Sequence, residues 1–165
     1  MQVKPRTRTI TWEDPMAAMS QADGMTGLEF IQAICAGKLP SPPIIATMGF
    51  TGGEAEEGKA TFHGEAGEYL YNPIGVVHGG FAMTILDSAM GCAVHTTMAA
   101  GEMYTTLETK VNFVRPITLD VGPVSCEGVV VHRGGKVVTA EGRLVADESG
   151  KLLAHGTTTC LVVKR

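Results

Sequence analysis

The sequence lacks several features that mark common classes of protein. Only 5% of its 165 residues are aromatic, and it contains a single tryptophan. No run of about 18 uninterrupted apolar residues occurs, which argues against a membrane-spanning helix. Residues 1–15 contain no apolar stretch of the kind that a secretory signal requires. We therefore expect a cytoplasmic protein without a membrane partner.

An excess of positive charge is also missing. The chain has 13 Lys and Arg against 17 Asp and Glu, a net charge of −4, which argues against a nucleic-acid partner. The histidines are scattered, and no spacing typical of a metal site, a phosphate-binding loop, a dinucleotide fold or a serine nucleophile is present. We therefore expect no metal and no cofactor. The four cysteines form no C-x-x-C pair and are expected to be free, buried thiols.

The composition is that of an ordinary globular protein, with 44% hydrophobic and 18% charged residues. A chain of this length suggests one domain with a sizeable core. Residues 1–24 are polar and contain Pro5 and Pro15, so we expect them to form a partly flexible N-terminal arm. Residues 25–165 are expected to form the single domain.

Hydrophobic periodicity predicts two helices and six strands in that domain. The first helix begins after Thr26, with Glu29 placed to complete a capping box, and ends near Gly37. The second, almost wholly apolar, runs from about 79 to 97. Strands are expected at 44–53 and 59–70, and within 104–117, 122–134, 136–147 and 151–164.

The short turns between consecutive strands favour an antiparallel sheet. A helix that is apolar on almost all sides must be enclosed by other elements. The simplest arrangement is an α+β fold in which one curved sheet wraps around the long helix.

One ionisable residue, Asp87, lies in the middle of the apolar helix. An enclosed carboxylate is costly, so its presence suggests a catalytic base or nucleophile. The alternative is that Asp87 faces solvent on a partly exposed helix. Gly79 and Gly80 stand at the start of the same helix, where the first backbone N–H groups lack a partner and suit a developing oxyanion. A plain glycine turn is the simpler interpretation of this pair.

The loop before the helix and the strand after it supply further candidates. His78 can act as a base or hold the loop by bonding to the backbone, and we favour the second role. Asn72 can position a water or simply form a turn. Thr105 and Thr106 can donate a hydroxyl, although threonine is also common in strands for other reasons.

A basic turn, HRGGK, is predicted at residues 132–136. Arg133 and Lys136 are the only concentrated positive charge that we identify in the chain. They either lie solvated at the tip of a hairpin or meet a phosphate of a ligand.

The pattern N-x-x-G-x-x-H-G-G, followed by an acidic residue nine positions after the histidine, resembles the hot-dog-fold acyl-CoA thioesterases. The similarity is strongest to the phenylacetate-degradation type, which includes the 4-hydroxybenzoyl-CoA thioesterases, and extends over roughly residues 26–163. The resemblance implies a hot-dog fold whose protomers pair edge to edge, with active sites at the dimer interface. It also implies that two dimers often form a tetramer.

Carried over by position, the resemblance implies that Asp87 is the nucleophile or general base. The Gly79 N–H would polarise the thioester carbonyl, while Asn72 and His78 would shape the loop and help to place substrate or water. Thr106 would contact the water or the carboxylate from the partner protomer, with Thr105 as the fallback. Gly80, Thr105, Arg133 and Lys136 are the expected substrate-binding residues. Some relatives have a threonine one turn after the acidic residue, where this sequence has Gly91.

The expected function is therefore hydrolysis of an acyl-CoA with a medium-chain or aryl acyl group, in which CoA is part of the substrate. Two alternatives stay open. One is a hydratase or dehydratase on the same fold, which would need a second His/acid motif that the sequence lacks. The other is an acyl-CoA-binding protein without enzymatic activity.

Overall fold

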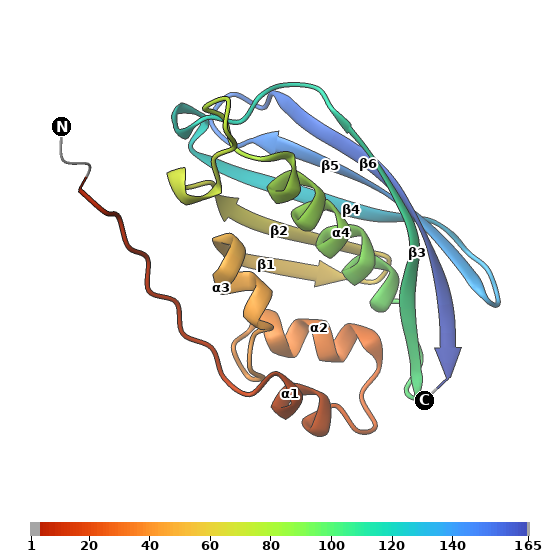
Figure 1. The fold of residues 1–165 in the computed structure, drawn as a ribbon. Helices are drawn as coiled ribbons and strands as arrows, with labels where there is room; N and C mark the ends of the chain where they lie inside the picture. The colour runs from red at the N-terminus through yellow and green to blue at the C-terminus, as the bar shows by residue number, and fades with distance from the viewer. Residues whose placement is uncertain (1–3, 165) are drawn as a thin grey trace.

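The computed structural model describes residues 4–164, in which a curved sheet wraps around one long helix, α4 (Gly79–His95) (Figure 1). All strand pairs are antiparallel, in the order β1-β2-β4-β5-β6-β3, so β1 and β3 are the edges. This confirms the predicted hot-dog fold. The strands are β1 (Phe50–Glu56), β2 (Lys59–Glu65), β3 (Glu102–Phe113), β4 (Pro123–Arg133), β5 (Val137–Ala146) and β6 (Leu152–Lys164).

The concave face of the sheet and α4 form the hydrophobic core. Ile85, Leu86 and Val94 of the helix are completely buried there. The helix is not enclosed on every side, however, because Met83 is 45% exposed and Asp87 is also exposed. The expectation of a wholly enclosed helix is therefore wrong for the single chain. No helix within residues 4–164 is long and apolar enough to span a membrane.

Three shorter helices precede the sheet (Figure 1). Of these, α2 and α3 contact β1, α2 also contacts α4, and α1 lies on the other side of α2 from β1. The predicted capping box is confirmed, since Thr26 caps α2 and exchanges hydrogen bonds with Glu29. The helix packs along β1, where the Gln32 side chain donates to the Ala55 carbonyl at 2.9 Å. These helices are α1 (Pro15–Gln21), α2 (Gly27–Cys35) and α3 (Pro43–Met48); single turns of 3-10 helix follow at Glu68–Leu70 and Leu119–Val121.

Two of these helices correct the sequence analysis. Residues 15–21, expected to belong to a loosely held arm, form α1, in which Asp14 caps the helix and Pro15 occupies its first turn. An Asp-Pro pair is a known helix-start signal, with Asp as the N-cap and Pro in the first turn. Residues 44–48 form α3 instead of a strand, and β1 begins only at Phe50. Residues 1–3 of the predicted arm and residue 165 lie outside the described residues.

The remaining strand predictions differ from the structure mainly at their ends. Strand β2 stops at Glu65 instead of residue 70, and residues 54–56, expected to lie between the two strands, belong to β1. The four C-terminal strands lie close to the expected segments. All four cysteines are free, as expected, but Cys35 is exposed and Cys92 is half-buried, whereas all four were expected to be buried.

Candidate active site

Asp87 is held by hydroxyl groups of the neighbouring strand. Its Oδ1 atom accepts hydrogen bonds from Thr106 Oγ1 at 3.3 Å and from Thr109 Oγ1 at 3.2 Å. Within residues 4–164, no hydrogen bond to Oδ2 is found. The carboxylate is thus oriented through one oxygen while the other is available for chemistry. The contact from Thr106 lies within one chain, whereas the resemblance implied a contact from the partner protomer.

A β-bulge in β3 explains why both threonines reach one carboxylate. In a regular strand, residues three positions apart point to opposite faces. The pairing of β3 with β6 shifts between Thr106 and Glu108, so Leu107 is an additional residue in the strand. This brings Thr109 to the same face as Thr106. The sequence analysis missed Thr109 because no pattern of residue types marks the bulge.

The start of α4 is shaped by its own N-cap. His78 Nδ1 accepts a hydrogen bond from the Gly80 N–H at 2.8 Å, so this N–H is already used. Gly79 is the first helical residue, and its N–H has no acceptor within the helix. A Cβ atom at this position would lie 3.0 Å from the ring of Phe113, which shows how closely β3 approaches the helix start.

Asn72 holds the loop before α4 through its side chain. Its Oδ1 atom accepts hydrogen bonds from the backbone N–H groups of Ile74 at 3.1 Å and Val76 at 3.2 Å. This is the turn-forming use of asparagine. The bonds made by Asn72 and His78 therefore support a loop-shaping role for both residues.

Gly79 and Asp87 are not brought together within one chain. They lie eight residues apart on one helix, which corresponds to about 12 Å along its axis. The carbonyl oxygen and carbonyl carbon of one thioester are adjacent atoms. One chain therefore cannot place both groups on the same thioester.

The other substrate-binding candidates make no hydrogen bond to Asp87 in the part of the chain that the structure describes. Arg133 donates to the Glu102 carboxylate at 3.1 Å and also to the Gly134 carbonyl, so its charge has a structural partner. Lys136 is exposed. Thr105 is also exposed and, by the alternation of the strand, points away from the face that Thr106 occupies.

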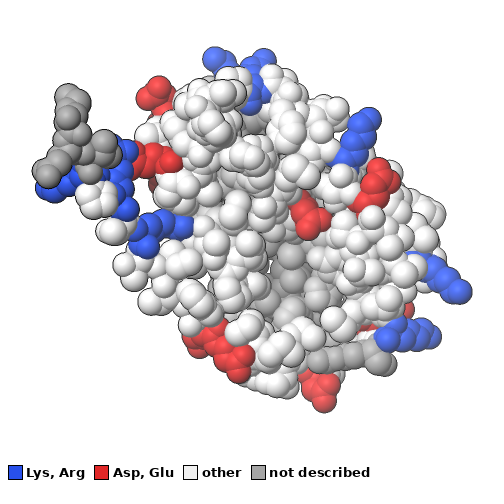
Figure 2. Space-filling model, in the orientation of Figure 1, with Lys and Arg blue, Asp and Glu red and all other residues white. Residues whose placement is uncertain are grey.

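Positive charge is spread out on the face of the molecule shown in Figure 2. Lys and Arg side chains lie toward the rim of this face, and the charged side chains nearest its middle are acidic. A concentrated phosphate-binding patch is therefore not visible on this side. The assignment of Arg133 and Lys136 to such a patch stays a prediction, and for Arg133 the bond to Glu102 competes with it.

An apolar pocket of about 350 Å³ opens beside Asp87, and we call it the acyl pocket. It lies between α4 and the N-terminal helices, with walls that include Ile31 and Ile34 of α2 and Phe62 of β2. Asp87 is the only carboxylate among the described residues that line it. The carboxylate thus stands at the edge of an apolar space that suits the apolar part of a ligand.

The polar groups deeper in the acyl pocket are neutral. Burial raises the pKa of the Cys92 thiol to about 12 and that of the Tyr104 hydroxyl well above its usual value. Burial also lowers the pKa of the His95 imidazole. A thiolate at Cys92 or a phenolate at Tyr104 is therefore disfavoured at neutral pH. His95 is a neutral imidazole that lies eight residues, or about 12 Å along α4, from Asp87.

Gly91 has a packing reason for being glycine. A Cβ atom there would lie 2.4 Å from the Tyr104 hydroxyl oxygen. The aromatic side chain thus occupies the space in which a threonine, found in some relatives of the resembled family, would stand. The hydroxyl groups at the carboxylate come from β3 instead.

Among residues 4–164, no group of three or more His, Cys, Asp or Glu side chains is placed to hold a metal ion.

Comparison with known proteins agrees with the fold. Residues 74–153, which include Gly79, Asp87 and both threonines, match the family model described as the thioesterase superfamily. A protein of Saccharolobus solfataricus, provisionally named an esterase, is 34% identical over 109 residues, covering 66% of this chain and 75% of that protein. The chain belongs to the thioesterase superfamily, a family of hydrolases.

Two solved structures are similar to this chain. A phenylacetic acid degradation-related protein from Ralstonia eutropha is 28% identical, with a TM-score of 0.70, covering 78% of this chain and 96% of that one. A Streptococcus mutans protein, solved bound to acetyl CoA, shares the fold at 22% identity and a TM-score of 0.62, covering 71% of this chain and 89% of that one.

Proposed function

We propose that the protein hydrolyses the thioester bond of an acyl-CoA, with Asp87 as general base or nucleophile. The observation that carries this proposal is a carboxylate held by two threonine hydroxyls at the edge of an apolar pocket. A thioester is an activated acyl group, because sulfur donates weakly into the carbonyl and leaves readily. It therefore needs only a base or nucleophile and a group that polarises the carbonyl.

Two reaction routes use the same carboxylate. As a base, Asp87 takes a proton from water while the oxygen attacks the carbonyl carbon. The C–S bond then breaks, and the CoA thiolate receives the proton. As a nucleophile, Asp87 attacks the carbonyl carbon itself, and the C–S bond breaks to release CoA and leave a mixed anhydride on Asp87. Water then hydrolyses this anhydride to the free acid. Both routes consume one water and yield the free acid and CoA.

We infer that two copies of the chain build the site. The 12 Å or so between Gly79 and Asp87 along α4 requires the carbonyl-polarising N–H to come from a second copy. Strand β3 is an edge of the sheet, and edge strands readily pair with another chain. Leu107 and Phe113 on this strand are 59% and 56% exposed, and Met83 of α4 is 45% exposed.

Pairing along β3 would cover these apolar side chains and the exposed Asp87 together. A tetramer made from two such dimers remains a prediction. The free cysteines fit a reducing compartment, and we propose that the protein acts in the cytoplasm.

The decisive experiment is release of free thiol from a panel of acyl-CoA esters, measured with a thiol reagent. Thiol release that follows enzyme concentration supports the proposal. Binding of acyl-CoA without thiol release would favour a binding protein. Addition of water across a 2-enoyl-CoA, again without thiol release, would favour a hydratase.

A further inference from the structure

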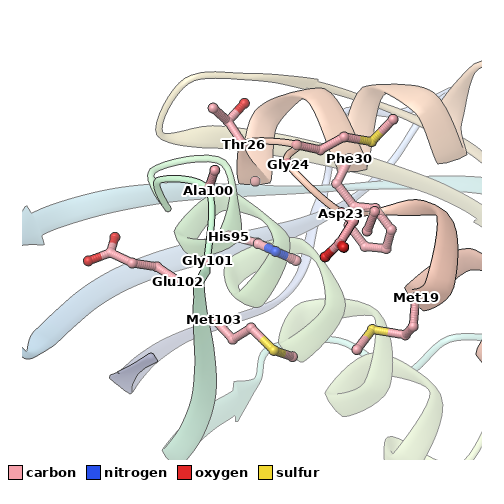
Figure 3. Close-up of a pocket in the computed structure, with 13 residues that line it drawn as sticks. Met19, Asp23, Gly24, Thr26, Phe30, His95, Ala100, Gly101, Glu102 and Met103 are labelled. Carbon is pink, nitrogen blue, oxygen red and sulfur yellow. The ribbon is translucent and has the colours of Figure 1, made fainter. Parts of the chain in front are cut away.

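Two cavities meet at one wall beside α4. The acyl pocket and a second cavity of about 150 Å³, which we call the end cavity, share three lining residues: Met19, Phe30 and His95. Asp87 lines the first cavity and not the second. In Figure 3, Phe30 and His95 project into the end cavity from α2 and α4, with Met103 of β3 beside them. The end cavity thus lies directly behind the far wall of the acyl pocket.

This wall is fixed by packing on several sides. The His95 ring lies between two aromatic rings, with centroid distances of 5.5 Å to Phe30 and 5.5 Å to Tyr104. The N-terminus of α2 is pressed against the end of α4, because the Gly27 N–H donates to the Met98 carbonyl at 2.9 Å. A Cβ atom at Gly27 would lie 1.8 Å from the His95 carbonyl oxygen, so the two helices cannot approach more closely.

The acyl pocket is elongated along α4. Ser88, Cys92 and His95 line it at helical spacing, so they mark one face of the helix running away from Asp87. From Asp87 to His95 is eight residues, or about 12 Å along the axis. An extended chain advances about 1.2 Å per bond, since three backbone bonds span roughly 3.3–3.6 Å. The pocket thus accommodates roughly ten bonds of a straight chain before the wall is reached.

We propose that the wall formed by Phe30 and His95 sets the maximum length of an aliphatic acyl chain, and that the substrate is a medium-chain acyl-CoA. This inference rests on the proposed thioester hydrolysis. A straight chain fills the pocket along its length, whereas a single aromatic ring next to the thioester would leave the part near His95 empty. Each methylene that enters an apolar pocket is worth about tenfold or more in specificity.

The test is a chain-length profile of kcat/KM for straight-chain acyl-CoA esters from butanoyl to hexadecanoyl, with phenylacetyl-CoA alongside. For the wild type, kcat/KM should rise by about tenfold per added methylene until octanoyl or decanoyl and then fall. Phe30→Ala connects the two cavities and should move the maximum to dodecanoyl or longer. Phe30→Leu removes less volume and should give a smaller shift. It keeps the proposal testable if the Phe30→Ala variant does not fold.

Matched variants come from Met103, which lines the end cavity but not the acyl pocket. Met103→Trp fills the end cavity and should leave the wild-type profile unchanged. In the Phe30→Ala background, the same change should return the maximum to the wild-type length. Dissociation constants of non-hydrolysable thioether analogues of the same chain lengths should show the same order, which separates binding from turnover.

The outcomes distinguish the two proposals. If the wild type releases no thiol from any ester, the proposed function fails. If it hydrolyses the series but folded Phe30→Ala and Phe30→Leu both keep the wild-type maximum, the proposed wall is wrong. A wild-type preference for phenylacetyl-CoA over every straight chain would overturn the proposed substrate class while leaving thioester hydrolysis intact.

Discussion

The Thr109 hydroxyl donates a hydrogen bond to Asp87 Oδ1 across 3.2 Å. In a strand without a bulge, the Thr109 side chain would point to the opposite face from Thr106, away from Asp87. This relationship defines the candidate site more sharply than the carboxylate alone. It fixes which oxygen of Asp87 is occupied and which is available for proton transfer or attack. Because two separate threonines donate to Asp87, the contribution of each hydroxyl can be tested by substituting one threonine at a time.

Asp87→Asn should abolish most of the activity without harming the fold. The amide keeps the size of the side chain but removes its basicity, and a positioned base contributes about 10²–10⁴-fold to kcat. Because Asp87 is exposed in the single chain, the free energy of unfolding should change by only about 0.5 kcal/mol. The measurements are kcat with an acyl-CoA that the wild type cleaves and the thermal midpoint. Asp147→Asn, an exposed change away from the site, is the control, and a folded Asp87→Asn variant with wild-type kcat would remove Asp87 from the mechanism.

Thr109→Val and Thr106→Val should each lower kcat by about tenfold, since a hydrogen bond to a charged group contributes about 1.5–3 kcal/mol. Valine keeps the shape and removes only the hydroxyl. The KM should change little, because the acyl pocket is untouched. Thr157→Val, on an exposed position of β6, provides the matched control. Equal kcat values for all three variants and the wild type would mean that the hydroxyls do not orient the carboxylate.

Gly79→Pro removes one N–H while keeping a helix start. His78 has φ −61° and ψ 138°, the backbone conformation preferred before proline, and proline is well tolerated at the first helical position. Loss of an oxyanion donor costs about 10²–10³-fold in kcat. Gly79→Ala adds a Cβ near the Phe113 ring but keeps the N–H, so it should retain most of the activity. If both variants are equally active, the Gly79 N–H does not polarise the carbonyl.

Mixing the inactive Gly79→Pro and Asp87→Asn proteins should restore activity if the site combines two copies. In a mixed dimer, one of the two sites contains an intact Asp87 and an intact Gly79 N–H from different chains. Subunit exchange is followed by native mass spectrometry and thiol release by the same assay as before. Mixed dimers that form and stay inactive would show that the two residues do not act across an interface.

Arg133→Ala should lower stability more than it affects substrate binding. Its guanidinium is bonded to Glu102, and both side chains are less than a third exposed. A loss of about 1 kcal/mol corresponds to a decrease of about 2–4 °C in Tm for a chain of this size. Glu102→Ala should give a similar decrease in Tm. The double variant should lower Tm only slightly more than either single variant. A raised KM for CoA esters with an unchanged Tm in Arg133→Ala would instead support the phosphate-binding role.

Much of the fold follows from local patterns in the sequence. The capping pair Thr26 and Glu29, the glycines at the start of α4 and the turn residues between the C-terminal strands locate their elements well. The predicted secondary structure was wrong where one segment carries both strand and helix signals. The sequence PPIIATM has the branched apolar residues typical of a strand, but Pro43 at a helix start and the packing of the segment decide for α3.

The site was predictable in its residue types and less so in its geometry. The spacing from His78 to Asp87 pointed to the loop and the carboxylate of the candidate site, whereas Thr109 became visible only with the bulge at Leu107. The exposure of Asp87 was missed for a different reason. A run of apolar residues on a helix does not show whether they are covered by the same chain or by a second one.

The close contact between Gly27 and the end of α4 joins two parts of the chain, the segment before β1 and the region of α4 and β3. The residues proposed for chemistry lie on α4 and β3, while many of the walls of the acyl pocket come from the segment before β1. If the proposed function holds, mutations in α1, α2 or α3 should alter which acyl group is accepted without disturbing Asp87 and its threonines. On the proposed function, substrate preference would then be free to change independently of catalysis, provided that residue 27 remains glycine and keeps the first segment in place.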